Sequence, residues 1–170
     1  MFTDFTLDAF NEIKAAFATP NILTHPDENK PFLVETDASD FAIARVLSQY
    51  DSDQVLRPIA FYSRQLSSTK RNYEIYDKEL LSVFACFKEW RHYLQGGRHP
   101  VTVLSDHKNL AYFMTTKHLT RRQARWSIFF NEFDFTLTHR PGSRSGKPDF
   151  LSRRPDYYIP NDPSNFTQLL

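Results

Sequence analysis

Four acidic side chains occupy positions where a carboxylate needs an explanation. Asp37 ends the alternating stretch Phe32 to Asp37, and Glu79 lies on the apolar stripe of a predicted helix. Asp106 directly follows an apolar run, and Asp149 falls in the first turn of a predicted terminal helix. Carboxylate oxygens are the ligands that Mg²⁺ and Mn²⁺ prefer, so four acids brought together would form a divalent metal site. These four residues are the candidate catalytic residues and metal ligands.

Each acid also has a purely structural explanation. Asp37 opens the sequence Asp-Ala-Ser-Asp and could begin an Asx-type turn. Glu79 could lie at the edge of its stripe and pair with a lysine or arginine, because an unpaired buried charge is costly. Asp106 could cap the helix that follows it, and Asp149 is favoured in a first helical turn by the helix dipole. The residues alone leave these alternatives open.

The predicted strands place two of the acids. Phe32 to Asp37 alternates, with Phe32, Val34 and Thr36 on one face. Ala42 to Tyr50 and Val55 to Ser63 are separated by four turn-forming residues and predict a hairpin, so three antiparallel strands follow one another. Pro100 to Ser105 is nearly continuous in apolar residues, which indicates an interior parallel strand reached through a helical crossover. Phe133 to His139 alternates again and predicts a fifth strand.

The predicted helices follow from apolar spacing. Phe5 to Phe17 predicts a short amphipathic helix, and Ser68 to Leu94 predicts one long helix with Ser67 as its N-cap and Gly96-Gly97 as its stop. Further helices are expected from His107 to Met114 and from Thr120 to Asn131. In the last of these, we expect Trp126, Phe129 and Phe130 to belong to the core.

The composition sets broad limits. The chain has 170 residues, 41% of them apolar and 15% aromatic, which fits one folded domain with additional segments at its ends. Its single cysteine, Cys86, excludes a disulfide framework and fits a reducing, intracellular setting. No apolar run is long enough to cross a bilayer, and no signal peptide is evident, so we expect a soluble chain without membrane contact.

Charge is distributed unevenly along the chain. Residues 1–106 carry eleven Lys or Arg against fifteen Asp or Glu, a net charge of −4, whereas residues 107–154 carry ten against three, a net charge of +7. The second segment could bind a polyanion, or it could be a solvated surface on which basic residues cluster. Arg121, Arg122 and Arg125 beside Trp126 would suit phosphate contact, as would the basic loop Arg140 to Lys147.

Five motifs occur together in order: Glu35 to Ile43, Arg71 to Leu81, Ser105 to Leu110, Arg121 to Trp126, and His139 to Gly142 leading to Asp149 to Arg154. On these motifs, residues 5–156 resemble the ribonuclease H domain of a gypsy-type (Metaviridae) LTR-retrotransposon reverse transcriptase polyprotein. The resemblance implies the α/β ribonuclease H-like fold, a mixed five-stranded sheet of three antiparallel and then two parallel strands flanked by helices. This agrees with the order of elements derived from the residues.

The resemblance also implies a division of the chain and a set of roles. Residues 1–29 would be a connection segment after the polymerase part, 30–154 the ribonuclease H domain, and 155–170 a linker toward integrase or a disordered tail. Asp37, Glu79, Asp106 and Asp149 would hold two Mg²⁺ ions, with Mn²⁺ as a substitute. The expected nucleic-acid contacts are Ser39, Asn109, Arg121, Arg122, Arg125, Arg140, Arg144 and Lys147.

Two positions depart from the family pattern. Ala44-Arg45 stands where the family usually has Gly and a small residue, so Arg45 either crowds the sheet face or adds a phosphate contact. In the strand, Arg45 shares its face with Ile43 and Leu47, and its side chain must reach solvent near Asp37 or be buried and paired. His139, ten residues before Asp149, is a possible auxiliary residue in place of the mobile histidine of related enzymes.

The expected function is metal-dependent endonucleolytic hydrolysis of the RNA strand of RNA/DNA hybrids during reverse transcription. Two metals about 3.5–4 Å apart activate a water and stabilise the leaving oxygen, so no protein nucleophile is needed. RNA would be selected through its 2′-hydroxyl groups. The alternative is a catalytically weak or inactive structural or nucleic-acid-binding module derived from a retrotransposon. Expected partners are the hybrid and the polymerase domain and integrase of the same polyprotein, in a cytoplasmic virus-like particle or in the nucleus.

Overall fold

Five strands of the described chain form one mixed sheet. The computed structural model describes residues 7–8, 10–12, 14–15, 23–116, 118–141, 146–154 and 157. The strands are β1 (Leu33–Ala38), β2 (Ala42–Tyr50), β3 (Leu56–Gln65), β4 (Val101–Ser105) and β5 (Phe135–His139), in the order β3-β2-β1-β4-β5. β2 is antiparallel to its neighbours β1 and β3, whereas β4 is parallel to its neighbours β1 and β5. The predicted fold class and strand order are confirmed.

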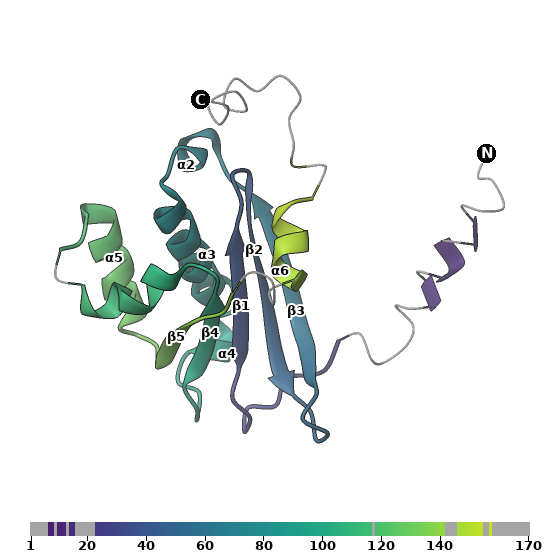
Figure 1. Ribbon diagram of the computed structural model, residues 1–170. Helices are drawn as coiled ribbons and strands as arrows, with labels where there is room; N and C mark the ends of the chain where they lie inside the picture. Colours follow the sequence, from purple (N-terminus) through teal and green to yellow (C-terminus); the bar gives the residue numbers. More distant parts are fainter. Residues whose placement is uncertain are drawn as a thin grey trace.

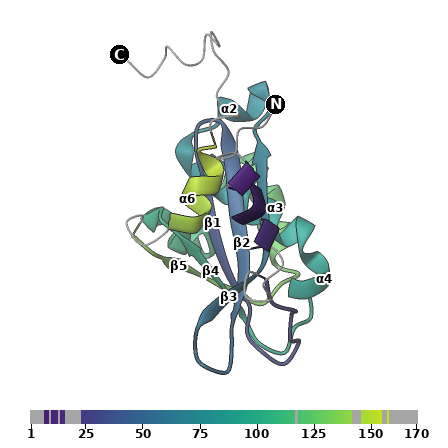
Figure 2. The same cartoon turned by 90° about the vertical axis from the view of Figure 1, so that its right-hand side faces the viewer.

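The helices cover the two faces of this sheet unequally. They are α2 (Ser68–Arg71), α3 (Ile75–Glu89), α4 (Arg91–Leu94), the 3₁₀ helix η1 (Lys108–Thr115), α5 (Arg121–Phe130) and α6 (Gly146–Ser152). Figure 1 and Figure 2 show α3 and α6 on opposite faces, with α5 on the outer side of α3. Among the labelled helices of the described chain, α6 is the one that packs on its face of the sheet, against β1, β2 and β3 (Figure 1 and Figure 2).

The prediction of one helix from Ser68 to Leu94 was wrong, because the chain breaks twice within it. Glu74 is extended (φ −58°, ψ 152°), so α2 and α3 are separate helices. Trp90 (φ −103°, ψ 27°) leaves the helical conformation again, and its indole is buried at 5% exposure. The expected end of the segment is confirmed, since Gly96 has a positive φ of 72° just after α4.

The segment predicted as a helix from His107 to Met114 is a 3₁₀ helix rather than an α-helix. Leu110 and Phe113 are both buried at 1% exposure and lie three residues apart. Residues three apart lie on the same side of such a helix, so both side chains face the core. The helix predicted from Thr120 is confirmed as α5, which begins with a capping box between Thr120 and Gln123.

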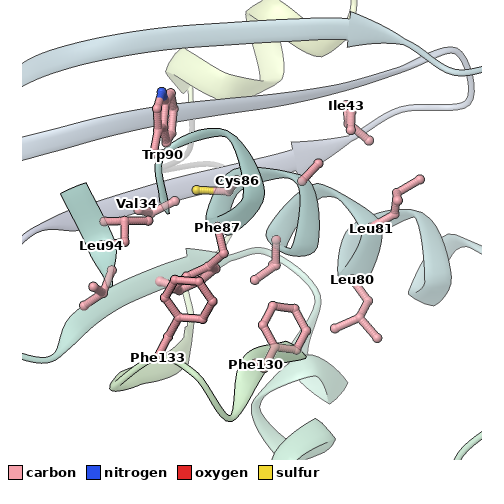
Figure 3. Close-up of a cluster of buried hydrophobic side chains, with 14 of the residues drawn as sticks. Val34, Ile43, Leu80, Leu81, Cys86, Phe87, Trp90, Leu94, Phe130 and Phe133 are labelled. Carbon is pink, nitrogen blue, oxygen red and sulfur yellow. The ribbon is translucent and has the colours of Figure 1, made fainter. Parts of the chain in front are cut away.

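Aromatic side chains fill the core between the sheet and α3. The ring of Phe87 lies 4.8 Å from that of Phe133 and 5.8 Å from that of Phe130, in edge-to-face arrangements (Figure 3). Trp126 and Phe130 are buried and Phe129 packs against the same cluster, as predicted. Cys86 is buried among these residues, and burial raises the pKa of its thiol.

Parts of the predicted organisation lie outside the described residues. Of the segment Phe5 to Phe17, residues 7–8, 10–12 and 14–15 are described as helical and exposed, and the rest are not described. Residues 155–170, apart from 157, are also outside the description. Among the described helices, none is long and apolar enough to cross a membrane.

Candidate active site

Three of the four predicted acids meet at one edge of the sheet. β1 and β4 are parallel neighbours, so their carboxyl ends lie side by side and bring Asp37 and Asp106 together. Glu79 reaches the same point from the second turn of α3. One carboxylate oxygen from each of the three residues lies within 4.8 Å of the other two. This arrangement is a candidate site for a divalent cation.

Asp37 is held in place by the helix on the opposite face from α3. Its side chain is 5% exposed and accepts a hydrogen bond from the hydroxyl of Ser152 in α6. Burial is the main cause that raises the pKa of Asp37, and the nearby Asp106 and Asp149 raise it further, while the Ser152 bond lowers it. The turn after β1 is made instead by Ser39, whose Oγ accepts from the N–H groups of Phe41 and Ala42. The Asx-turn explanation of Asp37 is therefore wrong.

Glu79 is the most deeply buried acid of the three, at 2% exposure. Oε1 accepts from the backbone N–H of Ala38 at 3.1 Å, and Oε2 accepts from Ser105 Oγ at 3.5 Å. No lysine or arginine of the described chain pairs with it, so the expected alternative of an ion pair is not realised. Burial, followed by the charges of Asp37 and Asp106, raises the pKa of Glu79 well above its ordinary value.

Asp106 lies on the solvent side of the group. It is exposed and directly follows β4. The N-cap of η1 is His107, and no side-chain hydrogen bond caps this end of the helix in the described structure. Asp106 therefore does not serve as the helix cap that its position also allowed.

Asp149 stands beside the three clustered acids. It falls in the first turn of α6, as predicted, and its Oδ1 accepts from Arg153 Nε at 2.6 Å. Its oxygens do not belong to the group that meets within 4.8 Å, but its charge contributes to the raised pKa of Asp37. The structure thus brings three predicted ligands together and places the fourth close by, engaged in an ion pair.

The donor set fits a hard divalent cation. Two buried carboxylates and one exposed carboxylate converge, and no cationic side chain of the described chain neutralises Glu79. Burial is the first cause of the raised pKa values of Asp37 and Glu79, and the proximity of the other carboxylates, unfavourable without a positive charge, raises both pKa values further. A bound cation would remove that repulsion.

Sequence reasoning missed the serines that orient the acids. Ser152 is 1% exposed, donates to Asp37 and, through its carbonyl, accepts from Ser39 Oγ at 2.7 Å. Ser105, the last residue of β4, donates to Glu79. The available signal was the spacing of Asp149 and Ser152, since residues three apart share a helix face.

The residues predicted to contact nucleic acid have different environments. Arg122 donates to Asp77 Oδ2 at 2.8 Å and stacks on Tyr73 with its Cζ 3.5 Å from the ring centre, so it joins α5 to α3. Arg140 pairs with the buried Glu35. The exposed candidates are Asn109, Arg121, Arg125 and Lys147, Ser39 is buried, and Arg144 lies outside the described residues. All eight remain predictions.

The two auxiliary candidates lie in different places. His139 ends β5 opposite Ser105 in the register and is half-buried, and its proposed role stays a prediction. Arg45 is buried at 1% exposure on the face of the sheet that α3 covers. It pairs in register with Thr36, whereas Asp37 pairs with Ala44. Its side chain therefore does not reach solvent beside Asp37.

The comparisons with known proteins agree with this architecture. A family model described as the RNase H-like domain found in reverse transcriptase matches residues 27–133. The chain belongs to this family. The match includes the three clustered acids and ends before α6.

Relatives of this RNase H-like domain include the transposon Tf2-3 and Tf2-4 polyproteins of Schizosaccharomyces pombe. Each is 40% identical over 147 residues, which is 85% of this chain and 11% of the polyprotein. The chain thus spans about a ninth of the length of these curated relatives. The domain is therefore similar to part of a retrotransposon polyprotein.

Two solved structures share the fold of the RNase H-like domain. A foamy viral protease-reverse transcriptase in complex with an RNA/DNA hybrid has a TM-score of 0.55 and 19% identity, covering 96% of this chain and 22% of that one. LC11-RNase H1, also in complex with an RNA/DNA hybrid, has a TM-score of 0.56 and 13% identity, covering 71% of this chain and 92% of that one. At these identities the likeness establishes the fold alone.

Proposed function

We propose that this domain is a divalent-metal-dependent ribonuclease H that hydrolyses the RNA strand of RNA/DNA hybrids within the reverse transcriptase of a gypsy-type LTR retrotransposon. The observation that carries the proposal is the convergence of Asp37, Glu79 and Asp106, with oxygens within 4.8 Å, at the carboxyl ends of two parallel strands. Family membership and relatives among retrotransposon polyproteins support the same assignment.

The residues of the chain divide the work of the site. Asp37, Glu79 and Asp106 would hold the cations, and Asp149 would join them once its carboxylate leaves Arg153. Divalent cations held there would lower the pKa of an attacking water and stabilise the leaving oxygen. Ser152 fixes the orientation of Asp37, while Ser105 and the Ala38 N–H fix that of Glu79. Mg²⁺ is the proposed ion, with Mn²⁺ as a substitute.

The setting of the domain is part of the proposal. Residues 30–154 would be the nuclease, 1–29 the connection from the polymerase part, and 155–170 the start of a linker toward integrase. The proposed partners are the hybrid, the polymerase domain and integrase, and the proposed location is a cytoplasmic virus-like particle or the nucleus. The alternative is an inactive module, and it rests on Ala44-Arg45. The burial of Arg45 at 1% exposure, with Nε and Nη1 lacking a hydrogen-bond partner among the described residues, is the observation that favours it.

The test is cleavage of a labelled RNA/DNA hybrid by the purified chain with Mg²⁺ or with EDTA, beside duplex DNA and duplex RNA. We expect metal-dependent cleavage of the RNA strand in the hybrid alone. Asp106→Asn, at an exposed position, should abolish cleavage and keep the melting temperature, whereas Asp53→Asn in the exposed β2–β3 loop should change neither. Cleavage that survives EDTA or Asp106→Asn would refute the proposal, and hybrid binding without cleavage would favour the inactive module.

A further inference from the structure

Arg45 is a buried guanidinium with unused hydrogen-bond donors. Its side chain is 1% exposed, and Cζ lies 3.9 Å from the ring centre of Tyr62 on the neighbouring strand. Nε and Nη1 have no hydrogen-bond partner among the described residues. Stacking on an aromatic ring offsets only part of the cost of removing a guanidinium from water, since buried charges are normally paired. The side chain therefore has capacity for a further ligand.

A cavity of about 430 Å³ opens beside this guanidinium, between β2, β3, α2 and α3. By the volume of liquid water, this is room for about 14 water molecules. Leu81, Phe84 and Ala85 of α3 form an apolar wall. The charged residues that line the cavity are Arg45, Arg64, Lys70, Lys88 and Glu89, four cations and one anion.

The cations of this cavity lie close enough to affect one another. Burial lowers the pKa of Lys70, and the charges of Arg64 and Lys88 lower it further. Burial also lowers the pKa of Arg45, and Arg64 adds to that effect, while Glu89 opposes it. The net formal charge of +3 is thus concentrated around one hollow, where an anion would be attracted by all four cations.

We propose that this cavity is an anion site that takes a phosphate group bearing two or more negative charges. Guanidinium donors arranged in a planar fork match the oxygens of phosphate, and lysines at the rim contribute further charge. A singly charged anion would leave most of the positive charge uncompensated. The deep position of Arg45 selects a ligand small enough to enter, or a phosphate that projects from a larger molecule.

The site is separate from the candidate metal centre. Lys88 follows Glu79 by nine residues on α3, which is about 14 Å along a helix axis. Arg45 lies on the α3 face of the sheet, whereas Asp37 faces Ser152 of α6. Phosphate binding in the cavity therefore does not depend on the proposed nuclease activity, and the two can fail independently.

The test is a titration of the whole chain with tripolyphosphate, in EDTA and at constant ionic strength in chloride. Binding is measured by calorimetry and by the Nε–H resonance of Arg45 in ¹⁵N NMR, assigned with Arg45→Lys. We expect that resonance to shift and the melting temperature to rise. The double variant Lys70→Gln/Lys88→Gln should raise Kd at least tenfold. The charge-matched control Lys14→Gln/Arg98→Gln, at exposed positions that do not line the cavity, should change Kd less than threefold.

Glu89→Gln separates the proposal from a simple internal pairing of Arg45 with Glu89. We expect this variant to bind tripolyphosphate severalfold more tightly, because an opposing charge is removed. A fall in melting temperature without a change in Kd would instead identify Glu89 as the partner of Arg45 and overturn the proposal. An unshifted Arg45 resonance at saturation, or equal weakening by the control, would overturn it as well.

A second experiment distinguishes two sources of the phosphate. Oligonucleotides compete with tripolyphosphate for the cavity, and the Arg45 Nε–H resonance reports which ligand is bound. Displacement by single-stranded or duplex oligonucleotides would identify a backbone phosphate of nucleic acid as the ligand. In that case Lys70→Gln/Lys88→Gln should also lower the salt slope of oligonucleotide binding by about two. If tripolyphosphate stays bound in the cavity in the presence of oligonucleotides, the ligand is a small polyphosphate and not nucleic acid.

Discussion

Removal of the charge of Glu79 should stabilise the metal-free protein. Asp37 and Glu79 are both buried, with oxygens within 4.8 Å of each other. At an effective dielectric constant of about 20, two unit charges at 4.8 Å repel by about 3.5 kcal/mol. Burial and this repulsion together raise the pKa of Glu79, so its ionisation costs free energy in the folded protein, and we expect Glu79→Gln to raise the free energy of unfolding by about 1–2 kcal/mol at pH 8.

The sign of the pH dependence follows from the raised pKa of Glu79. Below its ordinary pKa of 4.5 the carboxyl is neutral in the folded and the unfolded chain, so glutamine brings no gain. As pH rises, the unfolded chain ionises while the folded chain keeps its proton, so the wild type loses stability relative to the variant. The stability gain of Glu79→Gln over the wild type should therefore be small at pH 5 and larger at pH 8. It should stop increasing at pH values above the pKa of Glu79 in the folded protein.

The assay is urea and thermal unfolding of both proteins in EDTA at pH 5 and pH 8, then with Mg²⁺. A gain of 1–2 kcal/mol would raise Tm by about 2–8 °C for a chain of this size. Mg²⁺ should stabilise the wild type and act less on Glu79→Gln, because stabilisation by a ligand grows with the logarithm of its affinity for the folded state. Glu74→Gln, exposed at the start of the same helix, is the control and should shift stability by less than about 0.5 kcal/mol. A loss of stability at pH 8 would refute the reasoning.

Three further predictions concern the surroundings of the site. Ser152→Ala removes the donor to the buried Asp37 and should lower the free energy of unfolding by about 1–3 kcal/mol in urea denaturation; an unchanged midpoint would show that the bond contributes nothing. Arg125→Gln should reduce the salt slope of hybrid binding by about one. Arg122→Gln should leave that slope unchanged and lower stability, because Arg122 bonds to Asp77 and stacks on Tyr73. Equal salt slopes for the two variants would contradict the structure. Phe130→Ala, at 0% exposure, should cost about 3–5 kcal/mol in the same unfolding assay, and a cost below 1 kcal/mol would show that the aromatic core repacks.

The parts of the fold that the sequence predicts are those governed by local periodicity. The hairpin of β2 and β3, the two parallel strands and the start of α5 at Thr120 all follow from alternation, turn residues and apolar spacing within a few positions. The break at Glu74 does not, because the residues around it are compatible with a continuous helix and tertiary packing decides the direction of α3. The 3₁₀ winding of η1 was not predicted either, because residues three apart, such as Leu110 and Phe113, share a face in both kinds of helix.

The same distinction between local pattern and tertiary contact explains which residues of the candidate site could be predicted. Three acids could be found because an acid after a strand or on an apolar stripe is conspicuous in the sequence, and the structure brings them together. Ser152 was missed because its role depends on a contact with Asp37 across 115 residues. Arg122 was predicted as a surface contact, but its ion pair with Asp77 depends on how α5 packs against α3. The burial of Arg45 could be foreseen as one alternative, and its stacking on Tyr62 could not.

The attachment of α6 makes the candidate active site the last part of the fold to be completed. A helix of seven residues is too short to be stable alone, and α6 is held by the bonds of Ser39 and Asp37 to Ser152 and of Ser63 to Leu151. When the chain is synthesised from its N-terminus, all five strands leave the ribosome before α6 does, and the loop that joins Asp37 to Ser152 closes last. The same helix can later detach by local opening at a lower free energy than global unfolding requires. A nascent or partly digested chain can therefore have a folded core while the candidate site still lacks the contact between Ser152 and Asp37.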